Sequence, residues 1–154
     1  MSVRFRNLEI VPEQPVAEWP GEAVLAALEQ GSLQEWRRLV RAVRQEPWGR
    51  TARQIEQALA ISQPYGIAPA MERVIEAARR QQTERERREI AARVHALIAA
   101  SGLDRKEFAE RIGTSPSRLS TYATGKVVPS AAMLLRMQQL AERCGPGDLG
   151  SSPG

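Results

Sequence analysis

Apolar residues recur three or four positions apart through most of this chain, the spacing of residues that share one face of an α-helix. Glycines, prolines and capping residues divide this pattern into predicted helices over 22–30, 32–45, 51–61, 104–112, 116–123 and 131–144, with one or two further helices over 69–100. Only residues 3–10 alternate weakly, which leaves a short strand open as an alternative there. The pattern predicts an all-α protein with an N-terminal helical domain, a charged helical linker and a C-terminal helical domain.

The first 82 residues carry few local markers of a known architecture. Prolines at 12, 15 and 20 favour an extended arm over residues 1–20, with an unstructured terminus as the alternative. Residues 21–82 are expected to form a helical domain used for dimerisation or partner binding. Ser32 and Glu35 have capping-box spacing, and Thr51 is expected to cap the following helix. The apolar face of helix 32–45 is expected to contain Leu33, Trp36, Leu39, Val40 and Val43. We interpret Trp19, Trp36 and Trp48 as core anchors rather than as a ligand cage.

Residues 79–89 are almost entirely charged or polar and have no apolar stripe. The segment is either the middle of one long helix or a break near Gln82 with a restart at Thr83. Glu84 and Arg88 are four residues apart in the favourable order, which supports a helical linker. Whether 69–100 is one continuous helix is open at this stage.

Two short helices joined by a tight turn are predicted between residues 103 and 130. Asp104 can cap the first helix, and Gly113 can end it because glycine adopts a left-handed conformation without a Cβ penalty. Ser115 can cap the second helix, with Pro116 at its first position. The spacing turns Leu119 and Tyr122 inward and leaves small polar residues and one arginine outward: Ser117, Arg118, Ser120 and Thr121. Such a face suits the major groove of DNA, which admits a helix whose outward residues allow close approach.

This stretch resembles the helix-turn-helix of the XRE-type regulators, the family of phage repressors and Cro. The matching features are Leu103, Glu107-Phe108-Ala109, Ile112-Gly113, Ser115, Leu119-Ser120, Tyr122, Gly125-Lys126 and Pro129-Ser130, and with its flanking helices the resemblance covers about 86–143. It departs from the family at Arg105 and Pro116, where glutamine is common, so the bases read by relatives do not carry over. From the residues alone, the alternative is an αα-hairpin in a plain helical bundle.

The resemblance implies a lambda-repressor-like domain over residues 83–144 that binds double-stranded DNA, commonly as a homodimer. By that resemblance, Pro116, Ser117, Arg118 and Thr121 would face base edges. Backbone phosphates would be held by Arg105, Lys106, Ser115, Thr124 and Lys126.

Charge and composition agree with this interpretation. The formal net charge is +4, and residues from Thr83 onward hold 11 basic and 8 acidic residues, a net +3 of that total. No residue pattern indicates catalysis, a cofactor or a metal site, and the single cysteine, Cys144, excludes an intramolecular disulfide. The absence of a signal peptide and of an apolar run near 18 residues predicts a cytoplasmic protein without a membrane segment. The DNA binding that the resemblance implies predicts that it is nucleoid-associated. The composition of residues 145–154 predicts a disordered tail.

A second interpretation is an antitoxin or adaptor. Its N-terminal domain, residues 21–82, would bind a partner protein, and the helix-turn-helix would serve autoregulation. The N-terminal part is larger than a simple dimerisation arm requires, which favours this idea. RNA binding is weakly supported because no stacking aromatics lie near the basic residues.

Overall fold

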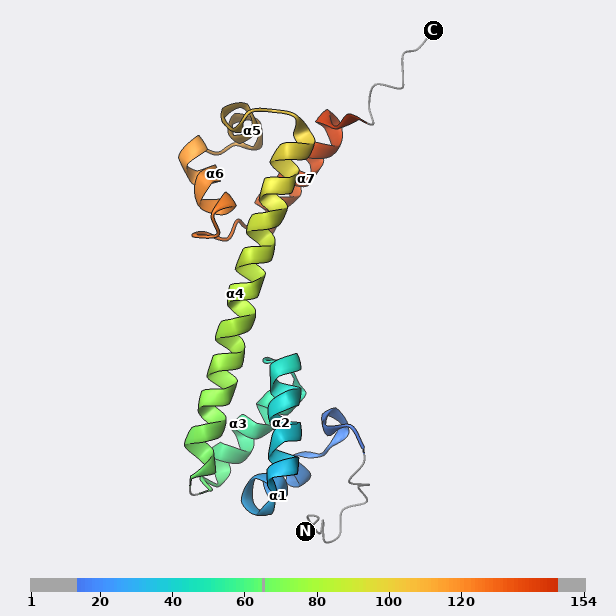
Figure 1. The fold of residues 1–154 in the computed structure, drawn as a ribbon, viewed down its shortest axis with the longest axis vertical. Helices are drawn as coiled ribbons and strands as arrows, with labels where there is room; N and C mark the ends of the chain where they lie inside the picture. Colours follow the sequence, from blue (N-terminus) through green and yellow to red (C-terminus); the bar gives the residue numbers. More distant parts are fainter. Residues whose placement is uncertain (1–13, 65, 147–154) are drawn as a thin grey trace. The chain divides into compact units, whose positions relative to one another are not determined.

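A computed structural model describes residues 14–64 and 66–146, and all regular structure in these ranges is helical (Figure 1). The all-α prediction is therefore confirmed. The possible strand at 3–10, the first part of the expected arm and most of the expected tail lie outside the described residues. The elements are a 3-10 helix, η1 (Val16–Glu18), and seven α-helices: α1 (Gly21–Gln30), α2 (Leu33–Gln45), α3 (Arg50–Ile61), α4 (Ile67–Ser101), α5 (Arg105–Ile112), α6 (Pro116–Ala123) and α7 (Ala131–Cys144).

The chain divides into two compact units, 1–82 and 83–154, and the division falls inside α4. The polar segment 79–89 does not interrupt this helix, so the question left open by the sequence is answered by one continuous helix. Side chains four residues apart pair along it, with Glu84 Oε1 3.4 Å from Arg88 Nε and Glu76 Oε1 3.6 Å from Arg80 Nη1. Each exposed pair of this kind contributes about 0.2–0.5 kcal/mol to helix stability.

The N-terminal unit packs α1, α2, α3 and the first turns of α4 around one apolar core. Trp19 and Leu39 are fully buried there, and Trp36 is half-buried against the same core. Two expectations are wrong. Leu33 is 59% exposed because it begins α2 at the edge of the unit, and Trp48 is 47% exposed in the turn between α2 and α3.

The segment before α1 packs on its own unit instead of extending away from it. Residues 16–18 form η1, so this part of the expected arm is not extended. The indole N–H of Trp19 donates to the carbonyl of Gln14 at 3.1 Å, and Gln54 Nε2 donates to the carbonyl of Trp19 at 2.9 Å. The Arg38 guanidinium lies 5.0 Å from the centre of the Trp19 ring, a cation–π arrangement. Contacts from α2 and α3 thus hold a segment that has little helix propensity of its own.

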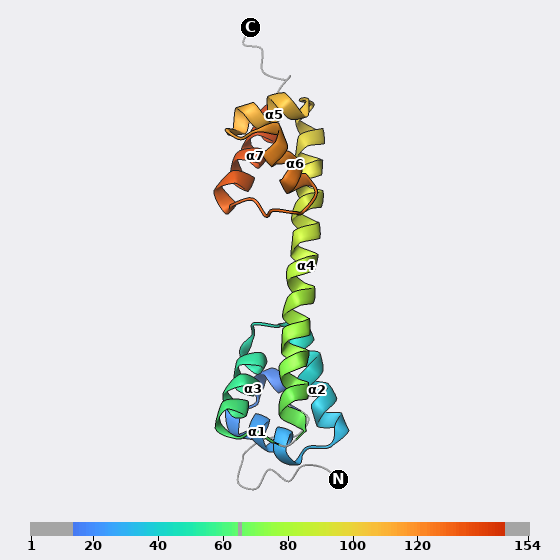
Figure 2. The same cartoon turned by 90° about the vertical axis from the view of Figure 1, so that its left-hand side faces the viewer.

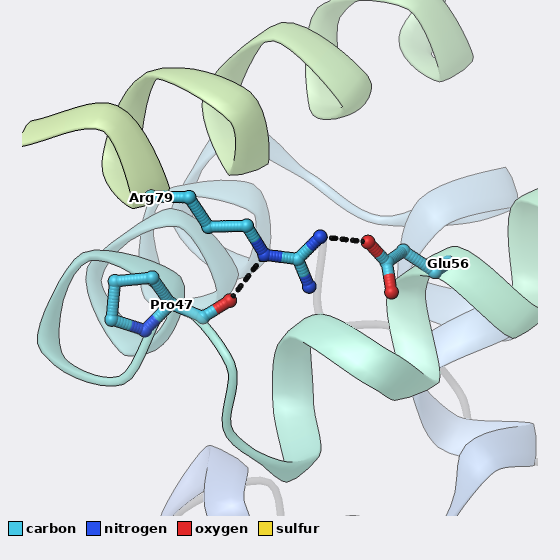
Figure 3. Close-up of polar contacts among 3 residues, drawn as sticks. All are labelled: Pro47, Glu56 and Arg79. Atoms are coloured by element: carbon cyan, nitrogen blue, oxygen red, sulfur yellow. Dashed lines mark hydrogen bonds and ion pairs between the residues drawn. The ribbon is translucent and has the colours of Figure 1, made fainter. Parts of the chain in front are cut away.

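Arg79 attaches α4 to the rest of the N-terminal unit (Figure 3). Its Nε donates to the carbonyl of Pro47 at 2.9 Å, and its Nη1 pairs with Glu56 Oε1 at 2.5 Å. One guanidinium therefore links α4 both to the α2–α3 turn and to α3.

Of the two helix caps predicted in this unit, one is present and one is not. The predicted capping box of α2 is present: the backbone N–H of Ser32 donates to the Glu35 carboxylate at 2.9 Å, and the Ser32 hydroxyl donates to the same oxygen. The expected cap at Thr51 is wrong. Helix α3 begins at Arg50 after Gly49, and Thr51 is buried within its first turn.

The C-terminal unit packs α5, α6 and α7 against the second half of α4 (Figure 2). Fully buried Val94, Phe108, Leu119, Met137 and Leu140 form its centre. Ser130 caps α7 by accepting the backbone N–H of Met133 at 3.1 Å. None of the described helices is long and apolar enough to cross a membrane.

Candidate nucleic-acid interface

Helix α5 and the turn after it are fixed by local interactions. The Asp104 carboxylate caps the helix by accepting the backbone N–H of Glu107 at 2.8 Å. Gly113 ends the helix with a left-handed φ of 83°, which an L side chain adopts only under strain. The buried side chains of Phe108, Ala109 and Ile112 lie on the inner face. This turn directs the chain into α6 after only three residues.

Helix α6 has one buried face and one exposed face. Leu119 is 0% exposed and Tyr122 is 5% exposed, so both side chains point into the core of the C-terminal unit. Pro116, Ser117 and Arg118 are exposed, and Thr121 is half-buried. The outward residues are thus small, polar or cationic, as the helical spacing predicted.

Arg118 is held in place by its own helix. Its Nε donates to the Tyr122 hydroxyl at 3.0 Å, one helical turn further along. This hydrogen bond, with the coulombic effect of Tyr122 second, raises the pKa of the Arg118 guanidinium. The two terminal nitrogens keep the fork that can bind a planar acceptor pair. The guanidinium is therefore oriented while its terminal nitrogens face outward.

Internal hydrogen bonds limit what the hydroxyl groups of α6 can offer. The Thr121 hydroxyl donates to the carbonyl of Arg118 at 2.6 Å, which leaves its oxygen lone pairs and its methyl group for a ligand. Ser115 Oγ accepts the backbone N–H of Arg118 at 3.1 Å and lies 3.3 Å from Ser117 Oγ. Ser115 can cap α6 and still donate its hydroxyl proton.

The expected phosphate-binding residues lie at the two ends of this pair of helices. Arg105 and Lys106 open α5 and are exposed, and Arg105 Nη2 lies 3.5 Å from His95 Nδ1 on α4. Thr124 and Lys126 follow α6 and are also exposed, and the Thr124 hydroxyl donates to the carbonyl of Thr121 at 3.3 Å. The roles of all these residues stay a prediction.

The stretch of sequence that contains α6 is basic and has no acidic residue. From Arg111 to Ala141 the sequence contains no aspartate or glutamate, and it contains four cations: Arg111, Arg118, Lys126 and Arg136. Spaced cations on a segment without acids favour the approach of a phosphate backbone, although exposed Glu107 and Glu110 lie on the neighbouring α5.

The described residues hold no group of three or more histidine, cysteine, aspartate or glutamate side chains with metal-binding geometry. His95 is exposed on α4, and Cys144 is half-buried, with Arg111 Nη1 donating to its sulfur at 3.4 Å.

The Arg118–Tyr122 hydrogen bond and the internal bond of Thr121 were missed from the sequence. The first had a signal, since arginine and tyrosine four residues apart on a helix can meet. The Thr121 hydrogen bond had no sequence signal of its own. A threonine hydroxyl in a helix can either bond a carbonyl of the preceding turn or point outward, and the sequence does not distinguish these rotamers.

Comparison with known protein families supports the resemblance. Residues 77–145 match the family described as a helix-turn-helix domain. The C-terminal unit therefore contains a helix-turn-helix domain, and the match includes every residue assigned to the candidate interface. No curated protein and no solved structure matches the chain.

Proposed function

We propose that this protein is a sequence-specific transcription regulator that binds double-stranded DNA as a homodimer and inserts α6 into the major groove. A helix-turn-helix domain in itself suggests DNA binding and transcription regulation. We further propose that it is located in the cytoplasm, associated with the nucleoid.

One observation carries the proposal. Burial of Leu119 and Tyr122 turns the opposite face of α6 outward, and that face has no bulky apolar side chain. The major groove is about 12 Å wide and accepts such a face closely enough for side chains to reach base edges. The acid-free sequence on both sides of α6 favours the same ligand.

Base reading would rest mainly on Arg118. Its terminal nitrogens suit the O6 and N7 acceptors of guanine, and its hydrogen bond to Tyr122 reduces the rotamer freedom that binding must remove. Thr121 offers a methyl group for thymine and lone pairs for an amino group, because its proton is used internally. Ser117 can donate or accept, and Pro116 can only make apolar contact.

Phosphate contacts would fix the domain on the duplex. Arg105 and Lys106 at the start of α5, Ser115 before α6 and Lys126 after it supply donors. Thr124 would donate its hydroxyl proton to a phosphate only by giving up its hydrogen bond to the Thr121 carbonyl. Such contacts carry no sequence information, and they make binding weaken as salt rises.

The homodimer follows from the size of the interface. One short recognition helix offers too few base contacts for tight specific binding, so two copies on a two-fold operator are expected. Their half-sites would then lie about 34 Å apart, one turn of the duplex.

Selection of bound fragments from random duplex DNA tests the proposal. We expect enrichment of a motif with two-fold symmetry and half-sites one helical turn apart. Recovery of unenriched sequence would contradict sequence-specific reading. An asymmetric single motif would contradict the homodimer alone.

A second candidate function is an antitoxin or adaptor in which the N-terminal unit binds another protein. In the described part of that unit, three large apolar side chains are exposed: Leu33, Trp48 and Ile61, the last at 82%. Exposed apolar side chains favour partner binding when they form one patch. Co-purification of the full chain with and without Ile61→Glu tests this. A partner lost with the variant would support the adaptor, and a chain that only self-associates would support the plain dimeric regulator.

A further inference from the structure

The turn after α6 packs directly on α4, and this contact brings another cation beside the proposed DNA-binding surface. A Cβ placed on Gly125 would lie 3.6 Å from the Cβ of Ala91 and 3.6 Å from the carbonyl oxygen of Arg87. Figures 1 and 2 both show the turn beside the C-terminal half of α4. The glycine adopts a φ of +78°, and the small side chain of Ala91 leaves room for the approach.

Arg87 and Ala91 are one helical turn apart and share the face of α4 that meets this turn. Ile90 and Val94 pack in the core just beyond them, so Arg87 lies at the edge where the buried part of α4 ends. Arg87 itself is exposed. It makes no ion pair with any residue in the described part of the chain.

Neighbouring acids do not cancel this charge. Glu84 lies on a nearby part of the helix surface, and its carboxylate pairs with Arg88 at 3.4 Å. Glu86 and Glu89 lie about 100° and 200° away around the helix, respectively. Next along the chain from Gly125 is Lys126, which is also exposed. Arg87 and Lys126 therefore place two cations from different elements at the same end of α6.

We infer that Arg87 binds a backbone phosphate of the duplex, beyond the phosphates contacted from α5 and from the turn after α6. This inference rests on the proposed function and extends the interface to a helix outside the helix-turn-helix motif. The guanidinium fork suits a phosphate, and the long side chain can reach past the turn that packs at its base.

Arg85 provides a matched control. It is also exposed and stands on the same helix two positions before Arg87. Two positions turn the helix by about 200°, so Arg85 points away from the turn. Arg85→Ala and Arg87→Ala remove the same charge from the same helix and differ in the face that loses it.

The test measures affinity of the full chain for mixed-sequence duplex DNA over a series of salt concentrations. Each phosphate contact adds about 0.9 to the slope of log affinity against log salt. We expect Arg87→Ala to reduce that slope by about 0.9 and to weaken binding, Arg87→Lys to restore most of both, and Arg85→Ala to change neither. Equal far-UV circular dichroism and melting temperature of the variants exclude misfolding as the cause.

Equal effects of Arg85→Ala and Arg87→Ala, or no effect of either, would overturn the assignment of Arg87. In that case, a steep salt dependence of the unaltered chain would still support its binding to duplex DNA. A chain with no affinity for duplex DNA at all would overturn both.

Discussion

The two units of this protein hold their helices by different means. In the C-terminal unit, α5, α6 and α7 each begin at a side-chain cap, namely Asp104, Ser115 and Ser130. In the N-terminal unit, α1 and α3 follow Pro20 and Gly49 with no side-chain cap, and only α2 has a capping box. Side chains there instead bind backbone carbonyls of other segments: Trp36 donates to Ala27, Gln54 to Trp19 and Arg79 to Pro47.

The helix ends of the C-terminal unit are therefore set by local interactions, whereas the N-terminal unit is held together mainly by packing between distant residues. Caps and left-handed glycines fix where each short helix starts and ends, which a recognition helix needs if its outward residues are to meet base edges. Contacts between distant residues stabilise a core but tolerate different helix boundaries. The site of proposed DNA binding lies in the unit with the stricter local geometry.

The largest expected effect concerns the segment that long-range contacts hold in the N-terminal unit. Trp19→Ala removes a fully buried indole and should lower the free energy of unfolding by about 3–5 kcal/mol. Trp48→Ala removes the same side chain from a position that is 47% exposed and should cost much less. Urea denaturation followed by circular dichroism measures both. Equal losses would mean that residues 14–20 are not part of this fold.

A smaller effect is expected from the local geometry of the C-terminal unit. Gly113→Ala forces an L side chain into a φ of 83° and should destabilise the protein by about 1–2 kcal/mol. Gly21→Ala is the control, because nothing lies within 4 Å of the added Cβ and its φ is not left-handed. Thermal melting compares the two. A tolerated Gly113→Ala would show that the turn does not depend on local conformation.

The smallest effect compares two serine caps, one in each unit. The hydrogen bond from the Ser32 hydroxyl, with backbone hydrogen bonds contributing less, holds the pKa of Glu35 below its usual 4.5. A lowered folded-state pKa adds stability above pH 4.5, and that stability is lost as pH falls through the folded value. Ser32→Ala should therefore cost about 1 kcal/mol near neutral pH and less in acid.

Ser115→Ala is the matched control because the residue three positions on is Arg118, which does not titrate in this range. Its cost should be about 1 kcal/mol and should not change between pH 7 and pH 3. Melting temperatures across that pH range measure both variants. Parallel pH profiles would contradict the role given to Glu35.

Sequence patterns predicted the two units unequally for the same physical reason. Caps and glycine turns depend on a few consecutive residues. The bounds of α5 and α6 and the burial of Leu119 and Tyr122 could therefore be predicted. Nothing local indicates that Gln54 and Arg38 would hold the segment around Trp19. The exposure of Leu33 and Trp48 likewise depends on which neighbours the fold supplies.

Within the candidate interface, spacing predicted which residues point outward but not how their donors are used. The proton of Thr121 is directed to the carbonyl of Arg118, and Arg118 is directed to Tyr122. The contact between Gly125 and α4 joins residues more than 30 positions apart, which no periodicity shows. Chemistry that depends on rotamers and long-range packing requires coordinates.

The most direct test of the account compares affinity for the enriched motif with affinity for mixed-sequence duplex, in Arg118→Ala and in Lys126→Ala. Loss of a bidentate contact should reduce discrimination in Arg118→Ala by about 1–3 kcal/mol. Lys126→Ala should weaken both affinities about equally and flatten the salt slope by about 0.9. If Arg118→Ala leaves discrimination unchanged, α6 does not read the duplex through its exposed face, and the central claim fails.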